Sequence, residues 1–140
     1  MMDFQGKIAL VTGASSGMGA ETARLLSDGG ARVFGAQRGL SDFEDIAVDF
    51  ADPSSPERAI EHIAKATGQL DILVNNAGVM REGTVEETSL DDWHLQMQIN
   101  LTVPFLLIRY AMPLLRAARG AIVNVGSIEG LGNNPRHPAY

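Results

Sequence analysis

The chain has 140 residues, of which 45% are hydrophobic and 20% are charged, a composition typical of one globular domain. Its net charge of −6, with no cluster of Lys and Arg, argues against a nucleic-acid-binding surface. The sequence contains no cysteine, which excludes disulfides, thiolate catalysis and Cys-ligated zinc. We therefore expect residues 1–140 to form a single domain.

The sequence carries no targeting or metal-binding signal. Its N-terminus lacks the basic and apolar regions of a signal peptide, and apolar runs such as residues 103–108 are far shorter than a membrane span. His62, His94 and His137 are scattered without the spacing of metal ligands. We expect a cytoplasmic protein with no metal, no membrane and no nucleic acid among its partners.

Short apolar runs recur along the chain, and continuous runs of this kind are typical of parallel strands that are buried on both faces. The predicted strands are residues 7–12, 31–37, 45–49, 70–74 and 121–125. The connection after the second strand, residues 38–44, is too short for a full crossover helix, which needs about a dozen residues.

Two helices are predicted between these strands. The first follows Gly19 and runs to about Ser27, where Gly29 and Gly30 provide a C-cap signal. The second begins with Ser55 as N-cap and Pro56 at the first helical position, and it ends at Gly68. Its apolar stripe is expected to comprise Ala59, Ile60, Ile63 and Ala64.

A longer helical region is predicted between the last two strands. Ser89 is its N-cap, and the region extends to about Ala118, with kinks or breaks at Pro104 and Pro113. Strands that alternate with helices predict an α/β fold, a parallel sheet with helices on both faces.

The turn after the first strand carries the strongest chemical signal. Residues 12–19 read Thr-Gly-Ala-Ser-Ser-Gly-Met-Gly and stand between a strand and a helix. A helix N-terminus offers free N–H groups and partial positive charge to a phosphate, and glycines let the backbone approach closely. The segment therefore predicts a dinucleotide phosphate-binding turn.

The spacing of this turn, with three residues between Gly13 and Gly17, resembles the cofactor turn of the short-chain dehydrogenase/reductase family. Residues 75–78 read Asn-Asn-Ala-Gly, as in that family, and Asn100 resembles its helix asparagine. Ser127 and Tyr140 stand 13 residues apart (140 − 127), which is the family's usual serine-to-tyrosine spacing. The resemblance covers essentially the whole chain and implies a doubly wound Rossmann-type sheet of about five strands, in the order 3-2-1-4-5.

The resemblance also implies a function and the residues that carry it. The implied activity is NAD(P)-dependent hydride transfer between the nicotinamide and a small carbonyl or alcohol substrate. Tyr140 would be the acid/base, Ser127 would orient the substrate, and Asn100 would hold a water molecule. The cofactor-binding residues would be Gly13, Ser15, Ser16, Gly17, Met18, Gly19, Gln37, Arg38, Asp49, Asn76, Ala77 and Gly78. Members of the family commonly form dimers or tetramers.

The end of the second predicted strand bears on the choice of cofactor. Proteins that bind NAD usually place an acidic residue there to hold the ribose hydroxyls, and its charge repels the 2′-phosphate of NADP. This chain has Gln37 at that position, followed by Arg38, whose forked donors suit a phosphate. The sequence therefore favours NADP(H) over NAD(H). The alternative is that Arg38 is a solvated loop residue that pairs with Asp42, Glu44 or Asp45.

The family places a lysine four residues after the tyrosine, whereas this sequence stops at Tyr140. We therefore expect the C-terminal part of the fold to be missing and the 140-residue chain to be inactive alone. One alternative is a catalytically inert dinucleotide-binding module or regulator. A sugar-nucleotide epimerase is disfavoured, because that branch usually has one residue fewer between the first two glycines.

Overall fold

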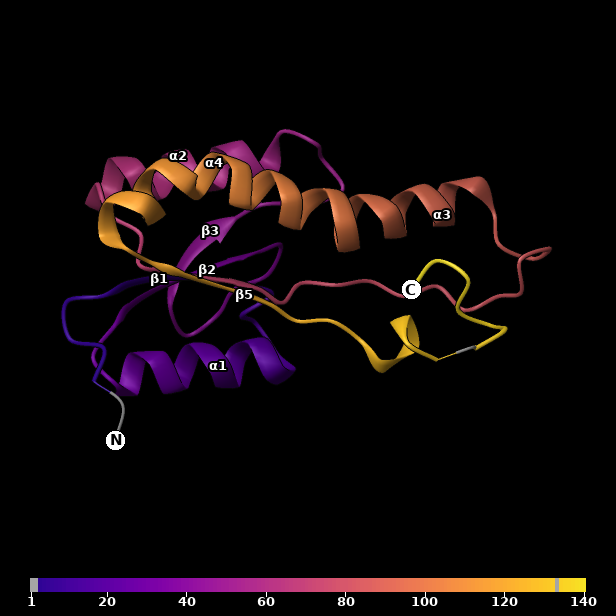
Figure 1. Ribbon diagram of the computed structural model, residues 1–140, viewed down its shortest axis with the longest axis horizontal. Coiled ribbons are helices and arrows are strands. Elements are labelled where there is room, and N and C mark those ends of the chain that lie inside the picture. The colour runs from indigo at the N-terminus through magenta and orange to yellow at the C-terminus, as the bar shows by residue number, and fades with distance from the viewer. Residues whose placement is uncertain (1–2, 133) are drawn as a thin grey trace.

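In the computed structural model, residues 3–132 and 134–140 are described. The strands in these residues are β1 (Ile8–Thr12), β2 (Arg32–Gln37), β3 (Glu44–Ala47), β4 (Ile72–Asn75) and β5 (Ala121–Asn124). They form one parallel sheet in the order β3-β2-β1-β4-β5, as Figure 1 shows. The predicted fold class and strand order are confirmed.

Helices lie on both sides of this sheet (Figure 1). Helix α1 (Gly17–Asp28) covers one side, and α2 (Ser55–Thr67) and α4 (Val103–Ala118) lie on the other. A shorter helix, α3 (Leu90–Met97), leads into α4 through a π-helical segment, η1 (Gln98–Thr102). A 3₁₀ turn, η2 (Ile128–Gly130), follows β5 near the C-terminus.

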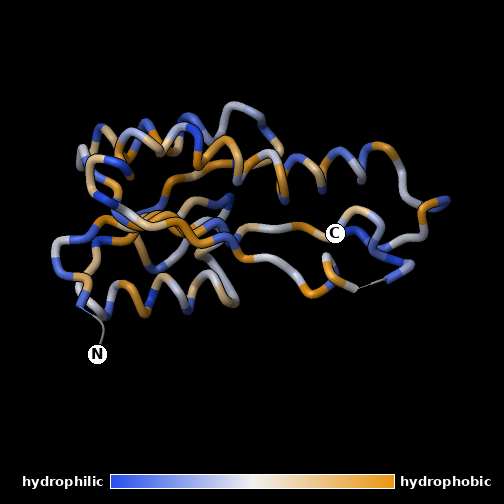
Figure 2. Tube along the Cα trace, viewed as in Figure 1, coloured by the Kyte–Doolittle hydropathy of each residue, from blue (hydrophilic) through white to orange (hydrophobic). Residues whose placement is uncertain are grey.

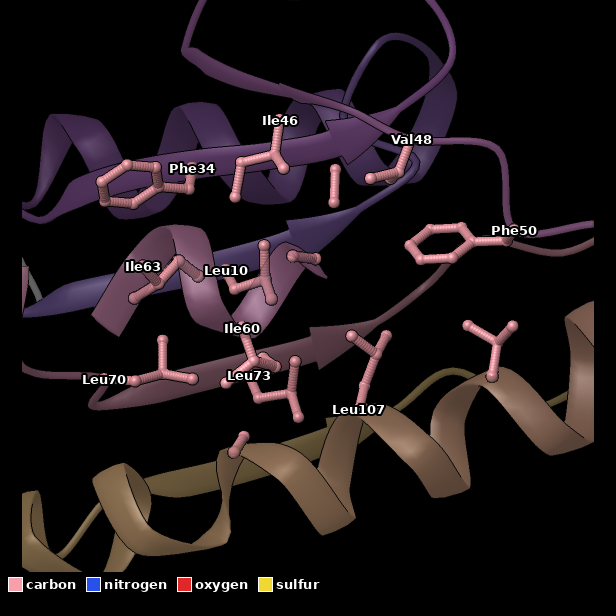
Figure 3. Packing of buried hydrophobic residues seen from close by; sticks show 14 of the residues in the cluster. Leu10, Phe34, Ile46, Val48, Phe50, Ile60, Ile63, Leu70, Leu73 and Leu107 are labelled. Carbon is pink, nitrogen blue, oxygen red and sulfur yellow. The ribbon is translucent and has the colours of Figure 1, made fainter. Parts of the chain in front are cut away.

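The larger core lies between the sheet and the two helices α2 and α4 (Figure 3). Leu10, Phe34 and Leu73 project from three neighbouring strands, and they meet Ile63 of α2 and Leu107 of α4. All five are fully buried, and burial of such a side chain stabilises a fold by about 1.5–3 kcal/mol. Figure 2 shows the same concentration of hydrophobic residues along the central strands.

The core under α1 is built from smaller side chains. Ala9 and Val11 of β1 and Val33 of β2 pack against Ala23 of α1, and all four are buried. Alanines at these positions let the helix lie close to the sheet. On β5, by contrast, Val123 is 49% exposed, so α1 covers the middle of the sheet and leaves that edge open.

Two helix starts differ from the prediction. Helix α1 begins at Gly17 rather than after Gly19, so the last glycines of the turn form its first turn. The N-cap of α2 is Ser54 rather than Ser55, because the Ser55 hydroxyl donates to the backbone oxygen of Asp49. Its C-terminus is as predicted, since Gly68 adopts a left-handed φ of 68°.

Of the kinks or breaks predicted at Pro104 and Pro113, no break occurs in the described residues. The segments α3, η1 and α4 form one continuous helical stretch, Leu90–Ala118. Pro104 lies inside this continuous stretch and has no N–H to donate to the preceding turn. Just before it, η1 accommodates an extra residue per turn, as the Val103 N–H bonds to the oxygen of Gln98. Pro113 lies exposed inside α4.

This helical stretch is long and apolar enough, by length and composition, to cross a membrane, although residues 103–108 alone are not. Within it, Val103, Leu107 and Leu115 are buried against the sheet and α2, in the manner of a core helix. Leu101 and Phe105 point away from this core and are 65% and 59% exposed.

A buried carboxylate ties the start of β4 to β1. The side chain of Asp71 is 5% exposed, and its oxygens accept from the Ile8 N–H at 2.9 Å, Gln69 Nε2 at 2.6 Å and Lys7 Nζ at 3.0 Å. Burial by itself raises the pKa of Asp71, but the donors, led by the Ile8 N–H, hold the pKa below its usual value.

Replacement of Asp71 by Asn is expected to lower the free energy of unfolding at pH 7 by about 2 kcal/mol, since a charge-assisted acceptor becomes a partial donor. The folded-state pKa lies below the unfolded value of about 3.9, so the stabilisation is complete above that pH and lost as the pH falls through the folded pKa. Urea unfolding measures the free energy of unfolding of the wild type and of the variant, and the difference between the two values should become smaller in acid. Asp42→Asn, at an exposed position, is the control, and a gap independent of pH would contradict the prediction.

Candidate functional site

The turn between β1 and α1 depends on its glycines. Gly13 and Gly17 have φ values of +69° and +54°, which favour glycine over other residues. At Gly19 the constraint is space, because a Cβ atom there would lie 2.1 Å from the backbone oxygen of Gly13. The chain therefore folds back on itself tightly where α1 begins.

Within the described residues, the N-terminus of α1 has no side-chain cap at this turn. Its N-cap, Ser16, is extended and makes no hydrogen bond from its side chain to the first helical N–H groups. The first N–H groups of any helix lack intrahelical partners and favour an anion. Ser15 and Ser16 are exposed beside them, and Met18 is 71% exposed. The observed geometry suits a phosphate at this position.

Hydrogen bonds join the ends of β1 and β4. The buried Thr12 hydroxyl accepts from the backbone N–H groups of Asn76 and Ala77, both at 2.9 Å. In return, Asn76 Nδ2 donates to the Thr12 backbone oxygen at 3.0 Å. The sheet order reverses at β1, with β2 on one side and β4 on the other, and ligands of open α/β sheets bind at such a point.

The end of β2 carries no acidic side chain that could hold ribose hydroxyls. The Gln37 side chain is buried, with Oε1 accepting from the Ala14 N–H at 3.1 Å and Nε2 donating to Asp45 Oδ1 at 2.6 Å. Arg38 follows and is exposed. Within residues 3–132 and 134–140 no carboxylate forms an ion pair with Arg38, and Glu44 pairs with Arg32 instead.

A cavity of about 570 Å³ lies at the carboxyl ends of the strands, and its volume is typical of ligand sites. Ten of the twelve predicted cofactor-binding residues line it: Gly13, Ser15, Ser16, Met18, Gln37, Arg38, Asp49, Asn76, Ala77 and Gly78. The other two, Gly17 and Gly19, lie in the turn behind them. Asp49 follows β3, which ends at Ala47 instead of extending to residue 49, and its Oδ1 accepts from the Ala51 N–H at 2.9 Å.

Further lining residues escaped the sequence analysis. They are Ala36, Gly39, Phe50, Ala51, Val79, Leu95 and Ile99, and Arg81 lines the cavity beside them. Most are apolar and lie close in the sequence to the predicted residues. This closeness is the signal that could have identified them.

The helical stretch holds the segment after Asn-Asn-Ala-Gly in place. Asn100, in η1, accepts from the Val79 N–H at 2.9 Å and donates to the Val79 oxygen at 2.8 Å. One turn earlier, the fully buried Gln96 accepts from the Arg81 N–H at 3.0 Å. Gln96 was missed in the sequence, although its spacing of four from Asn100 places both on one helix face. Together they fix residues 79–81 beside the cavity.

The C-terminal segment gathers the remaining candidates. Ser127 precedes η2, and its hydroxyl accepts from the Glu129 N–H at 3.2 Å. His137 Nδ1 lies 3.4 Å from Glu129 Oε2, and the His137 ring meets the Tyr140 ring edge-on at a centroid distance of 6.4 Å. The His137 side chain is only 14% exposed, so it is a packed residue next to Tyr140.

Comparison with known proteins matches residues 7–140 to the model of the short chain dehydrogenase family. This chain belongs to the short chain dehydrogenase family. The predicted family resemblance is thereby confirmed.

Two relatives illustrate the match. The chain is 38% identical to an uncharacterized oxidoreductase of Thermotoga maritima, with 99% of this chain and 61% of that protein aligned. It is 35% identical to the 3-oxoacyl-[acyl-carrier-protein] reductase FabG of Salmonella typhimurium, over 99% of this chain and 62% of that protein. The chain thus spans about three fifths of the length of these relatives.

Solved structures agree in fold. The ligand-free aldohexose dehydrogenase of Thermoplasma acidophilum superposes with a TM-score of 0.91 at 30% identity, covering 98% of this chain and 55% of that one. An NADP active-site complex of Pseudomonas aeruginosa RhlG gives a TM-score of 0.89 at 32% identity, covering 99% and 61%.

Proposed function

We propose that the protein is an NADP(H)-dependent oxidoreductase that interconverts a small carbonyl compound and the corresponding alcohol. The observation that carries the proposal is the cavity that joins the uncapped N-terminus of α1, Arg38 and the Asn76–Gly78 segment at the point where the sheet order reverses. The free N–H groups of α1 suit the pyrophosphate, and the apolar Leu95 and Ile99 suit a flat ring.

The preference for NADP(H) rests on the end of β2. Gln37 carries no charge, and both ends of its amide already have partners within the protein. Arg38, beside it on the cavity wall, offers a guanidinium with no competing carboxylate in ion-pair range among the described residues. A 2′-phosphate at Arg38 would therefore meet a forked donor whose charge is not neutralised by an ion pair.

When bound, the reduced cofactor supplies a hydride to the carbonyl carbon, and the carbonyl oxygen then needs a proton. Tyr140 is proposed to donate that proton, and Ser127 to hold the same oxygen by a hydrogen bond. Asn100 is proposed to support this site through its two hydrogen bonds to Val79. In the direction of alcohol oxidation, the proton returns to Tyr140.

Relatives named for their activity include a 3-oxoacyl-[acyl-carrier-protein] reductase and a 3-alpha-(or 20-beta)-hydroxysteroid dehydrogenase, both of which act on carbonyl or alcohol groups. We propose a small molecule of the same functional class as substrate. We also propose self-association through the exposed face of the helical stretch, where Leu101 and Phe105 present apolar surface.

Replacement of Arg38 by Ala is expected to weaken NADPH binding by about tenfold, which corresponds to one charge-assisted contact, and to leave NADH binding nearly unchanged. Fluorescence titration of each cofactor measures both affinities. Arg109→Ala, at an exposed position on α4 away from the cavity, is the matched control. An equal loss for both cofactors would overturn the assignment of Arg38 to the 2′-phosphate, and no binding of either cofactor would overturn the proposed function.

A further inference from the structure

The connection between β2 and β3 has no helix of its own. After Gln37 the chain runs through residues 38–43 as bends and loop before β3 begins at Glu44. Arg38 and Gly39, at its start, line the cofactor cavity. In most βαβ units a helix would fix the position of such a segment, so here another element must do so.

One carboxylate takes this role. Asp45, the second residue of β3, accepts from the Ser41 hydroxyl at 2.6 Å and from the Ser41 N–H at 3.1 Å. The same Oδ1 atom accepts from Gln37 Nε2 at 2.6 Å. Gln37 at the end of β2 and Ser41 in the middle of the connection are therefore held on a single side chain, and Ser41 also accepts from the Phe43 N–H at 3.3 Å.

The chain of contacts continues into the phosphate-binding turn. Gln37 Oε1 accepts from the Ala14 N–H at 3.1 Å, so Asp45 is linked through one amide to the backbone after Gly13. The packing at this junction is close, since a Cβ atom on Gly35 would stand 3.0 Å from both Gln37 Oε1 and Ser41 Oγ. The amide of Gln37 is fixed in orientation, because its oxygen meets a donor and its nitrogen meets an acceptor.

We propose that Asp45 is a positioning residue that sets the preference for a 2′-phosphorylated nucleotide, by holding residues 38–41 and Gln37 in place. It acts through Ser41 and Gln37, because the described residues on the cavity wall include Arg38 and Gly39 but not Asp45. The carboxylate of Asp45 accepts hydrogen bonds from Gln37 and Ser41, and these bonds keep its negative charge away from the 2′-phosphate. The inference rests on the proposed function and goes beyond the direct contact of Arg38.

The test is Asp45→Asn, which keeps the size of the side chain but places an N–H₂ group against donors from Ser41 or Gln37. Affinities for 2′,5′-ADP and for 5′-AMP are measured by calorimetry, because these probes differ in the 2′-phosphate alone. We expect the preference of the wild type for 2′,5′-ADP to fall about five- to tenfold in the variant, mainly through weaker binding of 2′,5′-ADP. Asp42→Asn, exposed in the same connection, is expected to keep the preference.

Ser41→Ala is the second variant and removes only the hydroxyl from the network. It is expected to shift the same ratio in the same direction by a smaller factor, and it keeps the inference testable should Asp45→Asn fail to fold. If both variants keep the wild-type ratio, Asp45 does not position the 2′-phosphate site and the inference fails alone. If the wild type binds both nucleotides equally, the inference and the proposed preference for NADP(H) are both wrong. If the wild type binds neither nucleotide, the proposed function is wrong as well.

Discussion

Replacement of Gly19 by alanine is expected to reduce NADPH affinity by at least about 100-fold, which corresponds to about 2.8 kcal/mol. The added Cβ would lie 2.1 Å from the Gly13 oxygen, 2.8 Å from the Gly13 carbonyl carbon and 2.5 Å from Asn76 Nδ2. Two of these atoms belong to the backbone, so a rotamer change does not relieve the overlap. The first turn of α1 has to move away from β1, and its N–H groups move with it.

The effect on binding is separable from an effect on folding. Gly130→Ala is the matched control, because a Cβ atom there meets nothing within 4 Å. Circular dichroism and urea unfolding of both variants report the fold, and fluorescence titration reports NADPH affinity. A folded Gly19→Ala protein that binds NADPH as the wild type does would show that this close approach is not needed for the site.

The sheet and the glycine turn between β1 and α1 were predictable because their signals are local. Continuous apolar runs mark strands that are covered on both faces, and the spacing of Gly13 and Gly17 follows from the left-handed conformation that the turn requires at both. Helix ends were less predictable, because tertiary contacts decide them. Ser55 has the sequence of an N-cap, but its hydroxyl bonds to Asp49 and leaves Ser54 at the cap position.

The parts of the site that escaped the sequence analysis depend on contacts between segments. Gln96 is hydrogen-bonded to Arg81, 15 residues away in the sequence, and Asp45 is hydrogen-bonded to Gln37, eight residues away. Neither residue therefore belongs to a compact motif. His137 belongs to no sequence motif, yet it packs between Glu129 and the Tyr140 ring. Pro104 indicated a break, but a π-helical turn before it keeps the helix continuous.

Measured in a protein of the relatives' full length, of which this chain covers about three fifths, replacement of Tyr140 by phenylalanine is expected to lower the rate of carbonyl reduction by at least about 100-fold, the lower end of the range for loss of a general acid. Phenylalanine keeps the ring that packs against His137 and removes only the hydroxyl that is proposed to donate the proton. NADPH affinity should stay unchanged, since Tyr140 is not among the described residues that line the cavity proposed to bind the cofactor. The rate is followed by NADPH oxidation with a panel of carbonyl compounds.

Tyr110→Phe provides the matched control, because Tyr110 packs against the core on α4, away from the C-terminal segment. Loss of turnover in Tyr140→Phe with intact NADPH binding, alongside full turnover in Tyr110→Phe, separates the chemical step from cofactor binding. Unchanged turnover in Tyr140→Phe would assign the proton to another group. His137 would then be the next residue to replace, because its ring stands beside Tyr140 and its Nδ1 lies near the Glu129 carboxylate.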